Sequence, residues 1–210
     1  MSKVHLIIGG ARSGKSSLAE RYAKSSNLPV TYIATAQAFD DEMQQRIAQH
    51  QADRPAHWQL IESPLLLART IALALEDNRQ DICILVDCLT LWLSNSLCKP
   101  SIEADQTSEC NLAYWQEEKQ QLLSLLEHLQ RQDSPEHKVN GQLRKIEIIL
   151  VSNEVGHGIV PMGELSRQFV DQAGWLHQAI ASIADNVEFV MAGLSLTLKS
   201  AEKTNNKVQL

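Results

Sequence analysis

Residues 4–16 read VHLIIGGARSGKS, an apolar run followed by a glycine-rich loop that ends in Gly14, Lys15 and Ser16. The run favours a β-strand, the loop matches G-x-x-x-x-G-K-[ST] in full, and a helical segment follows. In this arrangement the backbone N–H groups of the loop converge on phosphate oxygens, the lysine reaches the β- and γ-phosphates, and the serine ligates Mg²⁺. A plain glycine turn would need neither Lys15 nor Ser16, so the sequence predicts a nucleotide site.

Around this unit, strand-like apolar runs alternate with segments of helical spacing, which predicts an α/β fold with a mainly parallel sheet flanked by helices. The expected strands are residues 4–8, 30–35, 58–62, 82–87, 145–151 and 187–193. The runs at 82–86 and 148–151 lack alternation, which is typical of central strands covered on both faces. We expect a single domain over residues 1–198 and a polar tail over residues 199–210.

Two helices are expected from apolar stripes. The first covers residues 111–131, and polar stretches at 99–110 and 132–144 on either side of it are expected to be surface loops. The core positions expected on the two helices are Leu112, Trp115, Leu122, Leu126 and Leu129, and then Leu165, Phe169, Leu176, Ile180 and Ile183.

Composition narrows the classes of function. The 210 residues carry 25 acidic and 19 basic side chains, a formal charge of -6, which argues against nonspecific binding to nucleic acid. The apolar runs are far shorter than a membrane span, and no signal peptide precedes the loop, so we expect a cytoplasmic protein. The four cysteines form no CxxC pair, which predicts reduced structural thiols rather than a zinc site.

Asp87 ends the apolar run ILVD at residues 84–87. A loop of this type takes a second magnesium contact from an aspartate at the end of such a strand, so Ser16 and Asp87 are the candidate metal ligands. Alternatively, Asp87 caps the helix that begins near Cys88, since aspartate is a favoured N-cap residue.

A basic helix face is expected within residues 40–53, which begin with acidic side chains and stop before Pro55. Arg46 and His50 are four residues apart and share one surface, and Arg54 lies close beyond. Neighbouring arginines favour the neutral, nucleophilic form of the imidazole and are able to hold phosphate oxygens. A solvated basic stripe without a catalytic role is the alternative.

The stretch SNEVGHGIVP at residues 152–161 follows a predicted central strand. Ligands of open α/β sheets collect at the carboxyl ends of the strands, where Asn153 and Glu154 would orient a nucleophile or a substrate hydroxyl. A tight connection in which Asn153 satisfies its own backbone is equally compatible with the residues.

Five segments together resemble the bifunctional adenosylcobinamide kinase/adenosylcobinamide-phosphate guanylyltransferase family of cobalamin biosynthesis. They are GGARSGKS at 9–16, YIATA at 32–36, DDEMQQRIAQHQADRPAHW at 40–58, ILVDCLTLW at 84–92 and VSNEVGHGIVP at 151–161. The resemblance extends to about residue 194 and implies a RecA-like P-loop NTPase fold and a homotrimer.

The resemblance also implies two reactions. ATP or GTP phosphorylates the hydroxyl of the aminopropanol arm of adenosylcobinamide, a corrinoid, and GMP then passes from GTP to that phosphate through a GMP-histidine at His50. Catalytic roles fall to His50 and to Lys15, which stabilises the departing pyrophosphate together with Mg²⁺. The implied nucleotide contacts are Gly9, Gly10, Ala11, Arg12, Ser13, Gly14, Lys15, Ser16, Ala34, Thr35, Ala36, Gln51, Ala52, Asp53, Arg54, Glu62 and Asp87.

Three points stay open. Position 157 inside the NEVGxGIVP motif is histidine here, which makes His157 a second candidate nucleophile. A simple small-molecule kinase on the same fold is a rival interpretation, with His50 only contacting phosphate. A nucleotide-operated switch is another, although the N-K-x-D signature of common switch GTPases is absent from the sequence.

Overall fold

The computed structural model describes residues 2–37, 41, 55–77, 80–99, 108–131, 138–139 and 142–201. The predicted basic helix face lies outside the described residues, apart from Asp41. The site residues that fall there are His50, Gln51, Ala52, Asp53 and Arg54.

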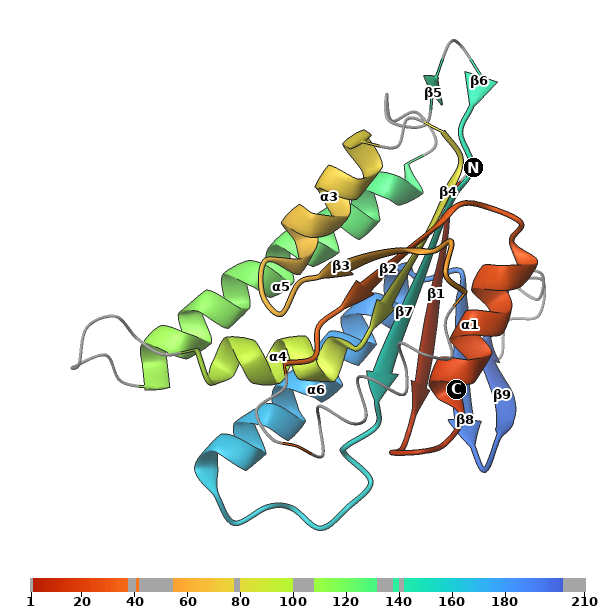
Figure 1. Cartoon of the computed structure of the whole chain (residues 1–210). Coiled ribbons are helices and arrows are strands. Elements are labelled where there is room, and N and C mark those ends of the chain that lie inside the picture. Colours follow the sequence, from red (N-terminus) through yellow and green to blue (C-terminus); the bar gives the residue numbers. More distant parts are fainter. Residues whose placement is uncertain are drawn as a thin grey trace.

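Within the described residues, the main sheet has seven strands in the order β3-β2-β4-β7-β1-β8-β9 (Figure 1). Neighbouring strands are parallel except β8 and β9, which pair in the antiparallel sense. The strands are β1 (Ser2–Gly9), β2 (Val30–Ala34), β3 (Gln59–Glu62), β4 (Ile82–Asp87), β7 (Ile146–Asn153), β8 (Asn186–Met191) and β9 (Leu194–Lys199). All six predicted strands are confirmed, and β4 and β7 lie side by side within the sheet as their apolar runs indicate.

Strand β9 was not predicted. Ala192 and Gly193 both have positive φ, 52° and 78°, and form the two-residue turn that joins β8 to β9. The residues of β9 are exposed, and they alternate as LSLTLK, a period-two signal that sequence analysis overlooked. The folded part extends into the expected tail, because the Lys199 ammonium donates to the carbonyls of Ala181 and Ser182 at 2.9 and 3.0 Å.

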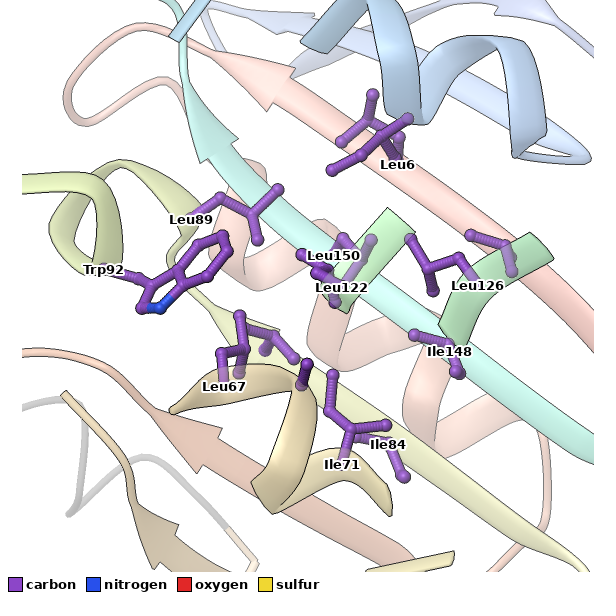
Figure 2. Close-up of a cluster of buried hydrophobic side chains, with 14 of the residues drawn as sticks. Leu6, Leu67, Ile71, Ile84, Leu89, Trp92, Leu122, Leu126, Ile148 and Leu150 are labelled. Carbon is purple, nitrogen blue, oxygen red and sulfur yellow. The ribbon is translucent and has the colours of Figure 1, made fainter. Parts of the chain in front are cut away.

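Helices cover the two faces of the sheet unequally (Figure 1). On one face lies α1 (Lys15–Ser25). On the other lie α3 (Leu67–Asp77), α4 (Leu89–Leu97), α5 (Ser108–Gln130) and α6 (Glu164–Ile183). Figure 2 shows the core of the second face, where Leu67 and Ile71 of α3, Trp92 of α4 and Leu122 of α5 converge on the strands. None of the described helices is long and apolar enough to span a bilayer.

The expected stripe of α5 is confirmed, with one polar member. Trp115, Leu122, Leu126 and Leu129 are buried, but so is Glu118. The Glu118 carboxylate accepts the backbone N–H groups of Leu66 and Leu67, where α3 begins, and burial raises its pKa. A side chain of α5 therefore satisfies N–H groups that the first turn of α3 leaves free.

The expectation of surface loops at 99–110 and 132–144 is wrong in part. Helix α5 begins at Ser108, and β5 (Lys138–Val139) pairs with β6 (Gln142–Leu143) as a short antiparallel hairpin. Arg144 is buried, because its guanidinium donates to the carbonyl of Leu75 at 3.0 Å and to that of Gln80, at and just after the end of α3. Leu165, expected in the core, is exposed at the start of α6.

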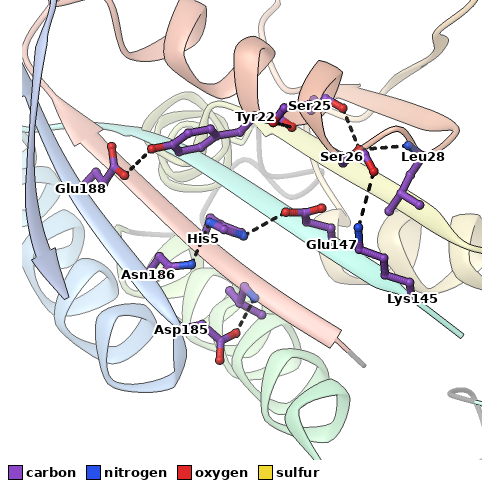
Figure 3. Close-up of polar contacts among 12 residues, drawn as sticks. His5, Tyr22, Ser25, Ser26, Leu28, Lys145, Glu147, Asp185, Asn186 and Glu188 are labelled. Carbon is purple, nitrogen blue, oxygen red and sulfur yellow. Dashed lines mark hydrogen bonds and ion pairs between the residues drawn. The ribbon is translucent and has the colours of Figure 1, made fainter. Parts of the chain in front are cut away.

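Charged and polar side chains of β1, β7 and β8 pair beneath α1, before the strands reach their carboxyl ends (Figure 3). The Nε2 atom of His5 lies 3.1 Å from a Glu147 oxygen, and the Asn186 amide donates to Nδ1 of His5 at 3.2 Å. The Tyr22 hydroxyl donates to Glu188. The hydrogen bond from His5 lowers the pKa of Glu147, and burial raises the pKa of Tyr22 to about 12.

Candidate active site

The glycine-rich loop joins β1 to α1, and within it the Ser13 N–H donates to the Gly10 carbonyl at 3.3 Å. Gly9 is the last residue of β1, and a Cβ at this position would lie 2.5 Å from the carbonyl oxygen of Val190. Gly14 has φ 97°, a conformation that favours glycine, and caps α1 without any side-chain hydrogen bond. Gly193 of the β8–β9 turn donates its N–H to the Ser13 carbonyl at 2.8 Å, so this hairpin supports the loop.

The other loop residues differ in exposure. Ala11 and Arg12 are exposed, Gly10 and Ser16 are half-buried, and Ser13 is buried with no partner for its hydroxyl. Lys15 is also buried, and its ammonium donates to the Gly10 carbonyl at 3.2 Å. The lysine therefore folds back over its own loop, which is where the motif requires a cation for phosphate oxygens.

Asp87 lies at the carboxyl end of β4, separated from β1 by β7. Its Oδ2 atom accepts from the Tyr32 hydroxyl at 3.3 Å, and the side chain is half-buried. The alternative that Asp87 caps α4 is wrong, because Cys88 occupies the N-cap position and makes no side-chain cap bond. The carboxylate is thus free of a helix-capping role.

Cys88 follows Asp87 at the carboxyl end of β4 and is buried. Burial raises the pKa of the Cys88 thiol to about 11; the Asp87 charge adds to this rise, and the Lys15 charge opposes it. The Lys15 side chain therefore lies close enough to Cys88, the residue after Asp87, for its charge to act on the thiol. Among the described side chains, Cys83, Cys88 and Cys98 are free thiols.

Thr35 is fully buried next to Asp87 and Cys88. Its hydroxyl donates to the Cys88 carbonyl at 2.7 Å and accepts from the Cys88 N–H at 2.8 Å, and its N–H donates to the Asp87 carbonyl at 3.2 Å. The Asn95 amide holds the Thr35 carbonyl at 2.8 Å. The side chain of Thr35 therefore positions the Asp87–Cys88 turn and is turned away from solvent.

Asn153, the last residue of β7, bonds across to α4. Its amide donates to the Thr90 hydroxyl at 2.7 Å, and the Thr90 hydroxyl contacts the Cys88 sulfur at 3.2 Å. The alternative in which Asn153 satisfies only its own backbone is wrong. Tyr32, Cys88, Thr90 and Gly193 are therefore part of the site, and sequence analysis assigned them no role.

The remaining predicted residues extend the site along the edge of the sheet. Ala34 ends β2 and is paired in register with Glu62, which ends β3 and is exposed. Ala36, two residues after Ala34, is half-buried. The carboxyl ends therefore run in the order Glu62, Ala34, Asp87, Asn153 and Gly9 along one edge. Such an edge is where ligands of open α/β sheets bind.

Comparison with known proteins identifies the family of the chain. A sequence model for cobinamide kinase / cobinamide phosphate guanyltransferase matches residues 5–198. The chain belongs to this family. It is similar to the "Bifunctional adenosylcobalamin biosynthesis protein CobP" of Pseudomonas aeruginosa, with 52% identity over 195 residues that cover 92% of this chain and 96% of that protein. It is also similar to the CobU protein of Salmonella typhimurium that carries the same description, with 37% identity covering 92% and 98%.

Membership makes the chain an enzyme of the kinase and guanylyltransferase class and confirms the resemblance inferred from the sequence motifs. Among solved structures, the chain is similar to an ATPase of a bacterial type III secretion system, with a TM-score of 0.54 and 14% identity. The match covers 93% of this chain and 56% of that one. At this identity the match concerns the fold alone, which is the predicted P-loop NTPase fold with a mainly parallel sheet.

Proposed function

We propose that this chain phosphorylates the hydroxyl of the aminopropanol arm of adenosylcobinamide with ATP or GTP, and then transfers GMP from GTP to that phosphate. The products are adenosylcobinamide-GDP and pyrophosphate. The observation that carries the proposal is the buried Lys15, whose ammonium donates to the Gly10 carbonyl of the loop, in a chain that matches the family from residue 5 to residue 198.

The sequence holds one complete G-x-x-x-x-G-K-[ST] motif, so a single phosphate site serves both reactions in this proposal. Lys15 and the N–H groups of residues 9–16 hold the β- and γ-phosphates, which become the leaving pyrophosphate when GMP is transferred. In the kinase reaction the same contacts stabilise charge on the transferred γ-phosphoryl group.

The order of the strands supports a guanine site at Glu62. Four strand spacings separate β3 from β1, about 19 Å at about 4.8 Å each. This span is similar to the extended length of GTP, so a nucleotide with its phosphates at the loop reaches Glu62 with its base. A carboxylate accepts both the N1–H and the 2-amino group of guanine, whereas adenine offers no such pair of donors.

Magnesium fits the residues at the loop. Ser16 and Asp87 offer a hydroxyl and a carboxylate, the hard oxygen ligands that Mg²⁺ prefers, and phosphate oxygens and water complete such sites. The described residues contain no group of three or more histidines, cysteines or acids that would hold a metal without the nucleotide. When bound, the ion neutralises phosphate charge; Tyr32 and Thr35 keep Asp87 in place for it.

His50 carries the GMP in this proposal. A neutral imidazole nitrogen attacks the α-phosphorus, the bond to the β-phosphate breaks, and the substrate phosphate then displaces the histidine. The motif RIxxHxxxRP supports the assignment, and Arg46 and Arg54 supply charge for the phosphate oxygens.

A homotrimer is also part of the proposal. The apolar side chains Met191, Leu194, Leu196 and Leu198 of the β8–β9 hairpin are more than half exposed beside the loop, at the edge of the sheet. An apolar edge of this kind favours association between copies. Sedimentation equilibrium measures the mass directly, and a monomer at micromolar concentration would contradict the proposal.

The proposed function is tested by following each phosphate of GTP separately. Wild type, His50→Ala and His57→Ala are incubated with Mg²⁺ and GTP labelled at the α-phosphate, then denatured, and the protein-bound label is tested for acid lability. We expect a phosphoramidate on wild type and on His57→Ala, whose replaced side chain is an exposed histidine nearby in sequence, and none on His50→Ala. With γ-labelled nucleotide and adenosylcobinamide, His50→Ala still labels the corrinoid.

Two results would contradict this function. Wild type that transfers γ-label but never takes α-label is a simple kinase. Label that persists on His50→Ala and disappears on His157→Ala moves the intermediate to the second candidate histidine.

A further inference from the structure

One carboxylate beside the loop, that of Glu154, is not used in the proposed function. Glu154 directly follows β7, the strand that pairs with β1 on one side and with β4 on the other. Gly9 and Asn153 are register partners, and the Glu154 N–H donates to the Gly9 carbonyl at 3.0 Å. Glu154 is therefore fixed by its backbone to the first glycine of the loop.

Glu154 and Asp87 hold different places relative to the loop. Strand β7 is adjacent to β1, whereas β4 lies one strand further away. The neighbour of β1 on its other side, β8, ends at Met191, which is apolar. Among the described strand ends, the carboxylate next to the strand of the loop is thus that of Glu154.

The Glu154 carboxylate is oriented but not neutralised by a fixed cation. Its Oε1 atom accepts from the Gly156 N–H at 2.5 Å and lies 3.7 Å from Nδ1 of His157, and the side chain is 21% exposed. In the described part of the chain, its ion-pair partner is this histidine, which is itself 79% exposed. A carboxylate in this state keeps its capacity to accept a proton from a nearby hydroxyl.

A second histidine, His177, is close enough to Glu154 for their charges to interact. Nε2 of His177, on α6, lies 2.6 Å from the Ser152 hydroxyl, and both side chains are buried. Burial lowers the pKa of His177, although the Glu154 charge acts in the opposite direction. A buried imidazole whose pKa is lowered does not compensate the negative charge of the Glu154 carboxylate.

We propose that Glu154 is the general base of the kinase reaction. The inference depends on the proposed function and adds the group that receives the substrate proton. As the corrinoid hydroxyl oxygen bonds to the γ-phosphorus, its proton passes to the Glu154 carboxylate. The bond from the γ-phosphorus to the bridging oxygen breaks, that oxygen leaves with the electron pair as part of the nucleoside diphosphate, and Glu154 returns the proton to solvent.

The guanylyl transfer does not need this base. Its first nucleophile is a neutral imidazole nitrogen, and its second is a phosphate oxygen that is already largely ionised at neutral pH. Neither nucleophile has to lose a hydroxyl proton. A change at Glu154 should therefore separate the two reactions, which a general disturbance of the loop would not do.

The test compares Glu154→Gln with Glu154→Asp and with Glu164→Gln, which removes an exposed carboxylate from the first turn of α6. We expect Glu154→Gln to lower kcat of the kinase about 100-fold or more, while KM for the nucleotide and capture of α-label at His50 stay within about threefold. Glu154→Asp keeps the carboxylate and should recover part of the lost rate, and Glu164→Gln should match wild type.

The inference is overturned if Glu154→Gln keeps kinase activity, or if its kinase activity and α-label capture fall together, which would mark a structural role. It is also overturned if His157→Ala, rather than Glu154→Gln, stops the kinase. Wild type without either reaction would instead contradict the proposed function, so the two failures are distinguishable.

Discussion

Charged side chains beneath α1 and charged side chains at the carboxyl ends of the strands have different kinds of partner. Beneath α1, before the strands reach their carboxyl ends, His5 pairs with Glu147, and Tyr22 pairs with Glu188 (Figure 3). At the carboxyl ends, Lys15 bonds a backbone carbonyl. Asp87 there accepts from a neutral tyrosine, and no ion pair joins the two among the described residues. Groups that satisfy one another contribute stability, whereas groups left with spare capacity are available to a ligand.

The largest effect expected from this difference is on activity at the carboxyl edge. Lys15→Ala should lower both the kinase and the guanylyl transfer about 100-fold or more, because each loses the cation that stabilises phosphate charge. Its melting temperature should stay close to that of wild type. The control is Lys24→Ala, which removes a half-exposed lysine from the last turn of the same helix and should leave both rates unchanged.

A smaller effect, on stability alone, is expected beneath α1. Glu147→Gln should lower the free energy of unfolding at pH 7 by about 1 kcal/mol, or about 3 °C in melting temperature, since it loses a partly buried charged hydrogen bond. The pKa of Glu147 is lowered in the folded protein, so its contribution is complete above the ordinary value of 4.5 and disappears as the pH falls below it.

Urea unfolding of wild type and Glu147→Gln between pH 7 and pH 3 measures this contribution. The stability difference between the two proteins should shrink as the pH falls below 4.5. A difference that grows with acid would contradict the ion pair. A loss of either enzymatic reaction at pH 7 in this variant would contradict the view that the pairs beneath α1 serve stability and the carboxyl edge serves catalysis.

The sequence was sufficient for those features that depend on local pattern. The loop at 9–16, the strand ending at Asp87 and the order of strands and helices follow from apolar runs, glycines and spacing. Strand β9 was also readable, because LSLTLK alternates with a period of two. The local signal for this strand is therefore present in the sequence.

Other features depend on contacts between distant segments, and no local pattern reports these. Thr35 bonds the backbone of Cys88, 53 residues further along, and Arg144 bonds the carbonyl of Leu75, 69 residues earlier. The capping of α3 by Glu118 is of the same kind. Each is a polar side chain that satisfies another segment's backbone, and its partner becomes known only when the chain is folded.

The central claim is that one nucleotide site at the carboxyl edge serves both reactions. The most direct measurement uses α,β-methylene-GDP, which has no γ-phosphate and no transferable GMP, as an inhibitor of the kinase and of α-label capture at His50. The account predicts competition with nucleotide in both assays and one inhibition constant. Inhibition of one reaction without the other would show two separate sites and contradict it.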